Sequence, residues 1–416
     1  MNKNIQKPWL IWGVAAFFYL YEMILRVSPS VMIEGLTLSF DTTSTMLGVL
    51  ISFYYYSYTF LQIPSGIIMD RLGSKNLIVL STILCSVGSV IFASTTQMYS
   101  AQIGRFFVGA GSACAFVSCL HIGSSLFPNK FALIAGVTNM MGTIGGLFGG
   151  VPVAILVNKI GWKETTYVLA LLGVLTTIMA LIFIPKKLGI RPISSGESII
   201  KSISEVLYKK QVVFFGVIAG LMYLPISAFS ELWAIPFFMA RHSLNNEMAG
   251  VASAILFLGV AIGSIILAMV SEYMGSCIKT IRYSALATSI LFVVLVYHKS
   301  SVITSFCLVF FIGIFTGAQV LNFLCAKNSV HDDLSGTTLA FTNTLVMLTG
   351  AIFQPVLGIL IDLFWDGKIS YEGMRQYDIS CYSKSILSLS ICLVVAYLLV
   401  FFVSDTHVKL KHAKNR

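Results

Sequence analysis

The sequence predicts an all-α, polytopic membrane protein with twelve transmembrane helices arranged as two six-helix pseudo-repeats. Composition is the first reason: 57% of the 416 residues are hydrophobic and 11% are charged, against about 25% charged residues in soluble domains. The second reason is a series of apolar runs, each close to the ~20 residues that a bilayer core requires. A β-barrel would instead show alternating segments of about ten residues, which the sequence lacks.

Short polar intervals separate these apolar runs. We expect transmembrane helices at about 9–31, 45–69, 76–94, 101–127, 131–157, 165–184, 212–234, 249–270, 281–297, 302–326, 337–361 and 385–403. The longest polar interval follows the sixth run. The expected organisation is an N-terminal six-helix bundle at 1–184, a cytoplasmic linker at 185–211, and a C-terminal six-helix bundle with a basic cytoplasmic tail at 212–416.

Basic residues set the expected orientation. Most Lys and Arg residues between the runs fall on the side that carries both termini, and cytoplasmic loops are enriched in these residues. Both termini should therefore be cytoplasmic, in a multi-pass protein of the bacterial inner (plasma) membrane. The net charge of +10 is then a topology signal and a contact with anionic lipid. We expect a small-molecule substrate and the lipid bilayer as partners, no nucleic acid, and a monomer.

The sequence lacks the motifs of an enzyme. None of the eight cysteines has metal-ligand spacing with histidine, so they are expected to be packing residues with free thiols. No zinc-protease motif, nucleotide-binding glycine loop or nucleophile elbow occurs. We therefore expect no enzyme activity, no metal and no cofactor, and a proton or other ion gradient is the candidate driving force.

The two halves are related by a common shift of about 202 to 205 residues. This shift places 70–74 on 272–276, 106–109 on 310–313, and Thr138-Asn139 on Thr342-Asn343. Each match is weak by itself, but a shared shift is what an internal repeat predicts.

The stretch at 66–75 reads Gly-Ile-Ile-Met-Asp-Arg-Leu-Gly-Ser-Lys. It resembles the signature loop between the second and third helices of the major facilitator superfamily, GxxxDRxGRK, with Ser74 replacing the first of the last two basic residues. The fourth run adds Arg105, Gly109 and Gly111, similar to the family's RxxxGxG pattern. The resemblance implies the major facilitator fold and a cytoplasmic gate that involves Gly66, Asp70, Arg71, Gly73, Lys75 and, in the second half, Glu272. The alternative for 66–75 is an ordinary helix stop with topogenic charges.

Four charged residues lie well inside the predicted spans, where each charge costs at least about 2.5 kcal/mol. They are Glu22, Arg26, Arg105 and Glu231. Glu22 and Arg26 are four residues apart and share a helix face. The family resemblance implies that the first, fourth and seventh helices line a central cavity, so these charges would bind a solute there. A structural ion-pair network, or snorkelling to water, is the alternative.

Two further sets of residues are candidates. Possible proton-coupling residues are Glu22, Glu231 and His121, although a lone histidine is more often a packing residue. Polar side chains expected to complete the substrate site are Tyr21, Tyr55, Tyr58, Tyr223, Asn139, Asn322 and Asn343. Packing and interhelical hydrogen bonding are the alternatives for these side chains.

The first span also carries a finer resemblance. Its Tyr21-Glu22-Met-Ile-Leu-Arg26-Val-Ser-Pro29-Ser stretch is similar to the proteobacterial branch that contains intraphagosomal amino-acid transporters and, more distantly, lysosomal dipeptide transporters. This implies a secondary active transporter, working by alternating access and with symport expected, for an amino acid or short peptide whose ammonium and carboxylate would meet Glu22 and Arg26. A carrier for organic anions, sugar acids or drugs, and a non-transporting sensor on the same fold, are the alternatives.

Overall fold

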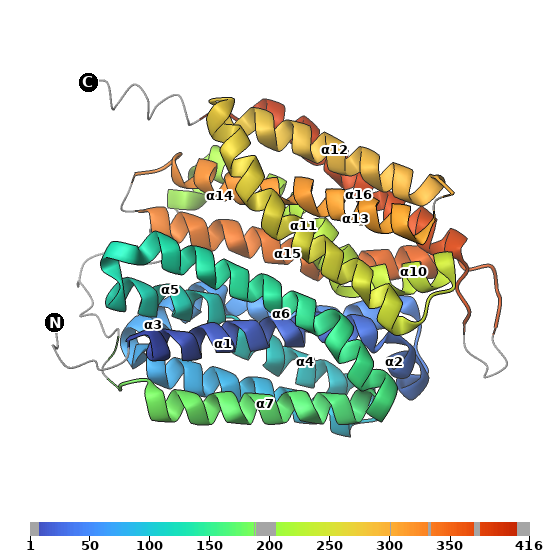
Figure 1. Cartoon of the computed structure of the whole chain (residues 1–416), viewed down its shortest axis with the longest axis horizontal. Coiled ribbons are helices and arrows are strands. Elements are labelled where there is room, and N and C mark those ends of the chain that lie inside the picture. The colour runs from blue at the N-terminus through green and yellow to red at the C-terminus, as the bar shows by residue number, and fades with distance from the viewer. Residues whose placement is uncertain are drawn as a thin grey trace. The chain divides into compact units, whose positions relative to one another are not determined.

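The computed structural model describes residues 8–186, 188, 205–299, 301–331, 334–369 and 375–405, apart from the side chains at 63, 66, 67, 70–72, 131 and 132. Most of this chain is helical (Figure 1). The helices of the first half are α1 (Pro8–Val27), η1 (Ser28–Val31), α2 (Ile33–Phe40), α3 (Ser44–Ser94), α4 (Met98–Ser112), α5 (Ala115–Leu126), η2 (Pro128–Lys130), α6 (Phe131–Ile160) and α7 (Trp162–Phe183). Those of the second half are α9 (Lys210–Leu224), η3 (Pro225–Trp233), α10 (Ala234–His242), α11 (Asn246–Tyr273), α12 (Cys277–Tyr297), α13 (Val302–Thr316), η4 (Gly317–Gln319), α14 (Val320–Lys327), α15 (Ser335–Leu363), α16 (Ile379–Leu399) and η6 (Val400–Phe402).

The helices are of membrane-spanning length and composition. Within the described chain, eleven segments are long and apolar enough to cross a membrane. A twelfth is obtained when the bent pair Ile33–Phe40 and Ser44–Gln62, with an angle of 110° between its helices, is counted as one span. The protein is therefore a multi-pass integral membrane protein, and the predicted fold class is confirmed.

Several spans contain breaks that hydropathy did not predict. Pro29 lacks the N–H group that continues an α-helix, and α1 passes there into the 3-10 turn η1. The fourth span is divided between α4 and α5, and the tenth is divided by η4, at positions related by the predicted repeat shift. In the seventh span, residues Pro225–Trp233 form a π-helix. Such π-helical segments are rare and occur frequently at functional sites.

The chain forms two compact units, each with its own core. The first unit consists of Met1–Phe40 and Leu50–Ser195, and the second of Asp41–Val49 and Gly196–Arg416. Within the first unit α1 packs on α6, and within the second α9 packs on α15. The first and fifth spans of each half are thus neighbours, as a repeat requires. The predicted linker at 185–211 falls largely outside the described residues, and its bounds stay a prediction.

Glycines allow close helix packing in the first unit. A Cβ atom at Gly145 of α6 would lie 2.4 Å from the Leu20 carbonyl oxygen of α1. On α4, a Cβ atom at Gly109 would lie 2.0 Å from the Tyr54 carbonyl oxygen of α3 and 2.3 Å from the Ser57 hydroxyl oxygen. Small residues at such crossings permit the direct backbone contact that stabilises helix pairs in membranes.

Gly109→Ala is therefore expected to destabilise the protein. The added methyl group meets the Tyr54 backbone, which cannot move aside like a flexible side chain, as well as the Ser57 hydroxyl, and overpacking of this kind costs about 1–3 kcal/mol. Gly136→Ala on α6 is the matched control, since no atom lies within 4 Å of its Cβ position, and its effect should be neutral or slightly stabilising. Thermal unfolding of the purified protein in detergent checks both variants. Equal unfolding temperatures would contradict the packing derived for Gly109.

Candidate functional site

The centre of the first unit holds a buried ion pair. Glu22 and Arg26 lie on successive turns of α1, and the Arg26 guanidinium donates a hydrogen bond to Glu22 Oε1. The two side chains are 0% and 4% exposed, so this pair is desolvated. The sequence prediction that they share a helix face is confirmed.

Tyr54 of α3 joins this pair to a second arginine. Its hydroxyl donates to Glu22 Oε1 at 2.8 Å and accepts from Arg26 Nε at 3.0 Å. The Arg26 guanidinium lies 4.9 Å from the centre of the Tyr58 ring, while the Arg105 guanidinium lies 5.0 Å from the centre of the Tyr54 ring. Cations over aromatic faces at such distances are stabilised by the ring quadrupole. Glu22, Arg26, Tyr54, Tyr58 and Arg105 form one cluster, which we term the arginine–tyrosine cluster.

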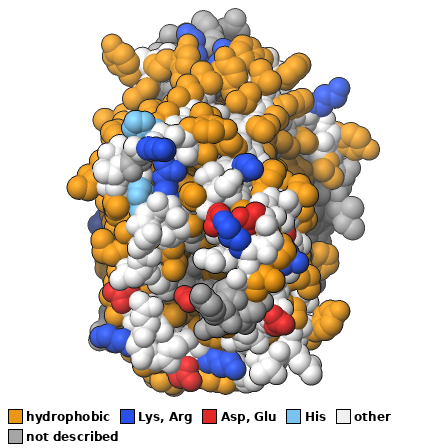
Figure 2. All heavy atoms as spheres, turned by 90° about the vertical axis from the view of Figure 1, so that its right-hand side faces the viewer, with side chains coloured by type: hydrophobic (Ala, Val, Ile, Leu, Met, Phe, Trp, Pro, Cys, Tyr) orange, Lys and Arg blue, Asp and Glu red, His pale blue; other side chains and the backbone are white. Residues whose placement is uncertain are grey.

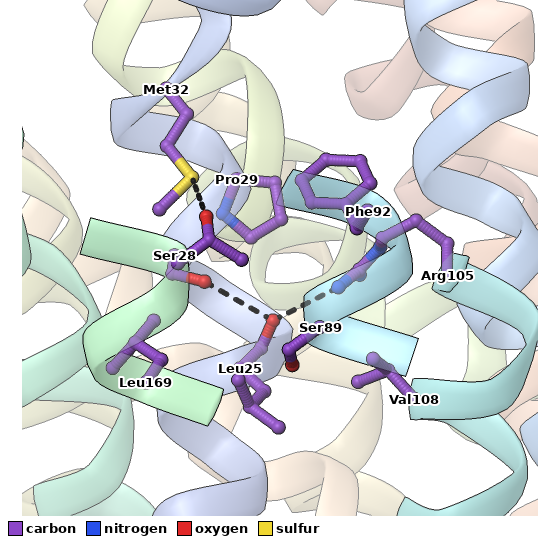
Figure 3. A pocket seen from close by; sticks show the side chains of 10 residues that line it. Leu25, Ser28, Pro29, Met32, Ser89, Phe92, Arg105, Val108 and Leu169 are labelled. Atoms are coloured by element: carbon purple, nitrogen blue, oxygen red, sulfur yellow. Dashed lines mark hydrogen bonds between the residues drawn. The ribbon is translucent and has the colours of Figure 1, made fainter. Parts of the chain in front are cut away.

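Arg105 is held in this cluster by the break in α1. Because Pro29 has no N–H, the carbonyl of Leu25 cannot accept the hydrogen bond that an unbroken helix would supply. Arg105 Nη1 donates to this carbonyl at 3.1 Å and Ser28 Oγ donates to it at 3.3 Å (Figure 3). The guanidinium also lies at the negative end of the α1 dipole. Arg105 thus supplies a hydrogen bond to the Leu25 carbonyl and brings a positive charge to the cluster.

A small cavity adjoins Arg105. Its walls are Leu25, Ser28, Pro29, Met32, Ser89, Phe92, Arg105, Val108, Thr166 and Leu169 (Figure 3). It offers room for about one water molecule. The cavity therefore has room for a water molecule beside Arg105, and a larger molecule would need the surrounding helices to move.

The second unit contains one of the predicted ionisable residues, Glu231. It lies in the π-helix η3 and is fully buried. Gln354 of α15 supports this segment, because its Nε2 donates to the Ser227 carbonyl at 2.8 Å. Trp233 Nε1 donates in return to the Gln354 carbonyl at 3.1 Å. The carboxylate is thus placed on a segment whose irregular backbone is fixed by α15.

The other predicted contact residues have different surroundings. Tyr21, Tyr55 and Asn322 are buried, Tyr223 and Asn343 are partly buried, and Asn139 is exposed. Asn322 Nδ2 donates to the Gln319 carbonyl at 3.1 Å, so this amide supports the break at η4. A Cβ atom at Gly173 of α7 would lie 2.4 Å from the Tyr21 hydroxyl oxygen. Tyr21 therefore points toward α7.

The predicted gate lies at a sharp turn in α3. The side chains of Gly66, Asp70 and Arg71 are outside the described residues, so their gating role stays a prediction. Gly73 has φ 76° and ψ 155° and separates the second span from the third. Gly275 also has a positive φ, of 61°, and it is the repeat-related glycine of the second unit. Both turns need the left-handed region that glycine enters without strain.

Residues around the Gly73 turn are tied to neighbouring helices. Ser74 Oγ lies 3.0 Å from His121 Nδ1, and Lys75 Nζ donates to the Leu181 carbonyl. The predicted proton-coupling residue His121 thus contacts the turn. Glu272 is exposed near the end of α11.

Two features of the site were missed by reasoning from the sequence. Tyr54 was one of several aromatic residues in the second span, and no local pattern indicates that its hydroxyl bridges Glu22 and Arg26. The bond from Arg105 to Leu25 was also missed. Pro29 was the available signal, because a proline inside a span frees the carbonyl four residues before it.

These observations define a helical membrane protein with a buried, charged and aromatic site in one of two related units. A model of the Major Facilitator Superfamily matches residues 11–355. The chain therefore belongs to this superfamily of transporters, as its sequence predicted.

Similar proteins include two bacterial transporters. The hexuronate transporter of Bacillus subtilis is 24% identical in an alignment of 369 positions, which covers 83% of this chain and 85% of the relative. The probable sulfoacetate transporter SauU of Cupriavidus necator is 24% identical over 184 residues, which are 44% of this chain and 43% of the relative. The match thus spans less than half the length of the latter protein.

A solved structure has the same fold. A bacterial homologue of the human lysosomal transporter Spinster, in its inward-facing and unoccupied conformation, superposes with a TM-score of 0.80. The superposition covers 98% of this chain and 99% of the other, at 16% sequence identity. This likeness extends to the fold alone.

Proposed function

We propose that this protein is a secondary active transporter that moves a small organic anion, with a carboxylate or sulfonate group, across the membrane by alternating access. The arginine–tyrosine cluster is the observation that carries this proposal. Arg26 and Arg105 converge on the ring of Tyr54 from two different helices, and paired guanidinium groups suit a planar carboxylate or a sulfonate. The names of two relatives, a hexuronate transporter and a probable sulfoacetate transporter, support the same substrate class.

Charge balance supports coupling of this anion to a proton. The buried ionisable side chains of the described spans include Glu22, Arg26, Arg105 and Glu231, and their formal charges sum to zero. Protonation of either carboxylate leaves one excess positive charge, which is costly inside a membrane protein. An anionic substrate would neutralise that charge. We therefore propose proton symport, with Glu22 or Glu231 as the proton carrier.

A second candidate substrate is the amino acid or short peptide that the first span led us to expect. Glu22 Oε2 accepts no hydrogen bond from the described residues. This oxygen is able to accept a donor from a substrate ammonium, while an arginine holds the carboxylate. The difference between the two candidates is whether a positive group on the substrate improves binding.

Thermal unfolding of the purified protein with a ligand panel distinguishes these candidates, because a ligand that binds only the folded state raises the unfolding temperature. The panel contains sulfoacetate, glucuronate, single amino acids and dipeptides. We expect an increase with the first two and uptake of the better ligand into proteoliposomes that is stimulated by an inward proton gradient. An increase only with amino acids or dipeptides would favour the second candidate. No increase with any of them would favour a non-transporting sensor.

The proposal also covers the membrane, the oligomeric state and the orientation of the protein. We place the protein in a bacterial inner membrane as a monomer with both termini in the cytoplasm. Accessibility of tags at the two termini in intact and permeabilised cells tests this orientation.

A further inference from the structure

Polar side chains join the third and fourth spans inside the first unit. The third span is the part of α3 that follows Gly73, and the fourth span consists of α4 and α5. Three pairs of side chains connect them: Ser112 Oγ lies 3.9 Å from Cys85 Sγ, Ser81 Oγ lies 2.8 Å from Cys114 Sγ, and Ser74 Oγ lies 3.0 Å from His121 Nδ1. We term these three pairs the polar seam.

The pairs of the polar seam follow one another at regular intervals. Between the pair at Cys114 and the pair at His121, each helix advances by seven residues, which is about two helical turns. Ser118 fills this interval, since it is fully buried and lies near the Cys114 thiol. Successive polar groups are therefore about one turn, or about 5 Å, apart. One water molecule with two hydrogen bonds bridges such a distance.

A glycine brings the two spans into backbone contact at the seam. A Cβ atom at Gly111 of α4 would lie 2.4 Å from the Ser81 carbonyl oxygen and 2.7 Å from Cys85 Sγ. The fourth span also breaks here, between α4 and α5. Cys114 lies in this break, and its Sγ donates to the Gly111 carbonyl at 3.8 Å. The backbone of both spans thus fixes the position of the thiols.

The hydroxyl groups of the seam face the neighbouring helix. A serine inside a helix often donates to a carbonyl of its own helix, as Ser86 and Ser89 do in the third span. Ser81 and Ser112 pair with thiols of the other span instead. Figure 2 shows acidic and basic side chains at the surface of the molecule, whereas the serines and cysteines of the seam are buried and uncharged. The seam is thus a neutral polar path in the interior of the unit.

One end of the seam meets the arginine–tyrosine cluster and the other end comes to the surface. The Ser112 hydroxyl is a hydrogen-bond partner of Tyr54, and the Tyr54 hydroxyl donates to Glu22 Oε1 at 2.8 Å. At the other end His121 is partly exposed. Histidine is the side chain that exchanges protons most readily near neutral pH. The seam therefore connects a buried carboxylate with a proton-exchanging group that reaches the surface.

The charges around Tyr54 favour movement of a proton into the seam. Glu22 is fully buried, so a proton that it carries needs a path through the protein. The guanidinium groups of Arg26 and Arg105 lie 5.4 and 5.0 Å from the centre of the Tyr54 ring. Both repel an excess proton at Tyr54, and this repulsion falls with distance. A proton that moves from Tyr54 toward Ser112 leaves the two positive charges behind.

We propose that the polar seam carries the proton of Glu22 through the first unit to His121. The protonated carboxyl of Glu22 gives its proton to the Tyr54 oxygen, and Tyr54 passes its own proton to Ser112. Each later hydroxyl, thiol or bridging water accepts one proton and gives up the one it held, so it ends neutral and returns to its first orientation by rotation. His121 takes up one proton and releases one to water. This inference rests on the proton symport proposed above, with Glu22 as the carrier, but not on the class of anion.

The rate at which Glu22 loses its proton tests the seam. In purified protein without substrate, time-resolved infrared spectroscopy after a pH jump follows the carbonyl stretch of the protonated carboxyl, which Glu22→Gln assigns by its loss. Cys114→Ala and Ser118→Ala each interrupt the seam, and we expect deprotonation about 100-fold slower, the lower end of what a positioned proton-transfer group contributes. Cys114→Ser keeps a group that passes a proton on and should stay close to the parent rate. Cys119→Ala is the matched control, because it removes a fully buried thiol of α5 outside the seam.

Transport separates proton release from folding. In proteoliposomes, Cys114→Ala should lower uptake driven by a proton gradient at least about tenfold. Exchange of labelled for unlabelled substrate should continue, because exchange requires no net release of protons. A packing defect at Cys114 would instead lower both rates together, and Cys114→Ser should restore the driven uptake.

The outcomes distinguish the seam from the proposed substrate. Equal deprotonation rates in the parent and in both folded alanine variants would overturn the proposal, and proton-stimulated uptake in those variants would leave the seam as interhelical packing. Absence of any infrared band that depends on Glu22 would overturn the proposal together with the role of Glu22 as the carrier. If the alanine variants slow deprotonation although no anion of the panel binds, the substrate class fails and the seam remains.

Discussion

Arg26→Ala is expected to lower the free energy of unfolding by about 3–5 kcal/mol, the usual cost of removing one partner of a buried ion pair. The change leaves the Glu22 carboxylate fully buried, with the Tyr54 hydroxyl as a neutral donor in place of a guanidinium. Thermal or denaturant unfolding in detergent measures the loss. Lys368→Ala is the control, because its ion pairs with Asp366 and Asp378 are exposed and their removal should have little effect.

The double variant Glu22→Gln/Arg26→Met separates stability from function. Removing both charges avoids an unpaired ion, and such replacements are often neutral or stabilising. We expect this variant to unfold near the temperature of the parent but to lose proton-stimulated uptake, since its cluster has lost one of the two candidate proton carriers and one of the two arginines that would hold the anion. Uptake at the parent rate by the folded double variant would show that the pair is structural. A stable Arg26→Ala protein would contradict the buried pair itself.

How much of this site the sequence predicts depends on how local each contact is. The pairing of Glu22 and Arg26 follows from a spacing of four residues on one helix, and the twelve spans follow from hydropathy. The bridge from Tyr54 depends on how α1 and α3 cross, to which Gly109 and its neighbours contribute. A periodic pattern in one segment carries no information on such a crossing.

The hydrogen bond from the backbone N of Thr45 to the Asp362 carboxylate illustrates the same limit. Thr45 and Asp362 lie at the edges of two predicted spans, and their spacing in the chain carries no pairing signal. The sequence predicts that α3 belongs to the first six-helix bundle, but its first residues belong to the second unit. The backbones of α3 and α15 approach each other closely at Gly48 and Gly358. Glycine spacing indicates close packing in general, and the partner is determined by the tertiary fold.

Arg105→Gln is expected to abolish anion binding while the protein stays folded. Glutamine is polar but shorter, so it does not reach the Leu25 carbonyl as Arg105 Nη1 does at 3.1 Å, while Ser28 Oγ still donates to that carbonyl. The change removes the positive charge that lies over Tyr54. If that charge holds the substrate, the ligand-induced rise in unfolding temperature should disappear and uptake should fall about tenfold or more, as expected when a charge-assisted bond is lost. Arg105→Lys should retain part of the ligand-induced rise in unfolding temperature and part of the uptake, because lysine keeps the positive charge but lacks the planar guanidinium that binds two oxygens at once.

Arg241→Gln provides the control for this experiment. Arg241 also donates to backbone carbonyls, those of Val296 and His298, but it lies at the end of α10 and is partly exposed. Both arginines therefore donate to backbone carbonyls, but only Arg105 is part of the arginine–tyrosine cluster. If the ligand-induced rise in unfolding temperature is lost in the Arg105 variant and kept in the Arg241 variant, the effect is due to the charge at the cluster. A full ligand-induced rise in unfolding temperature in folded Arg105→Gln protein would limit the role of Arg105 to its hydrogen bond with the Leu25 carbonyl at the end of α1. The anion would then have to be held by other residues.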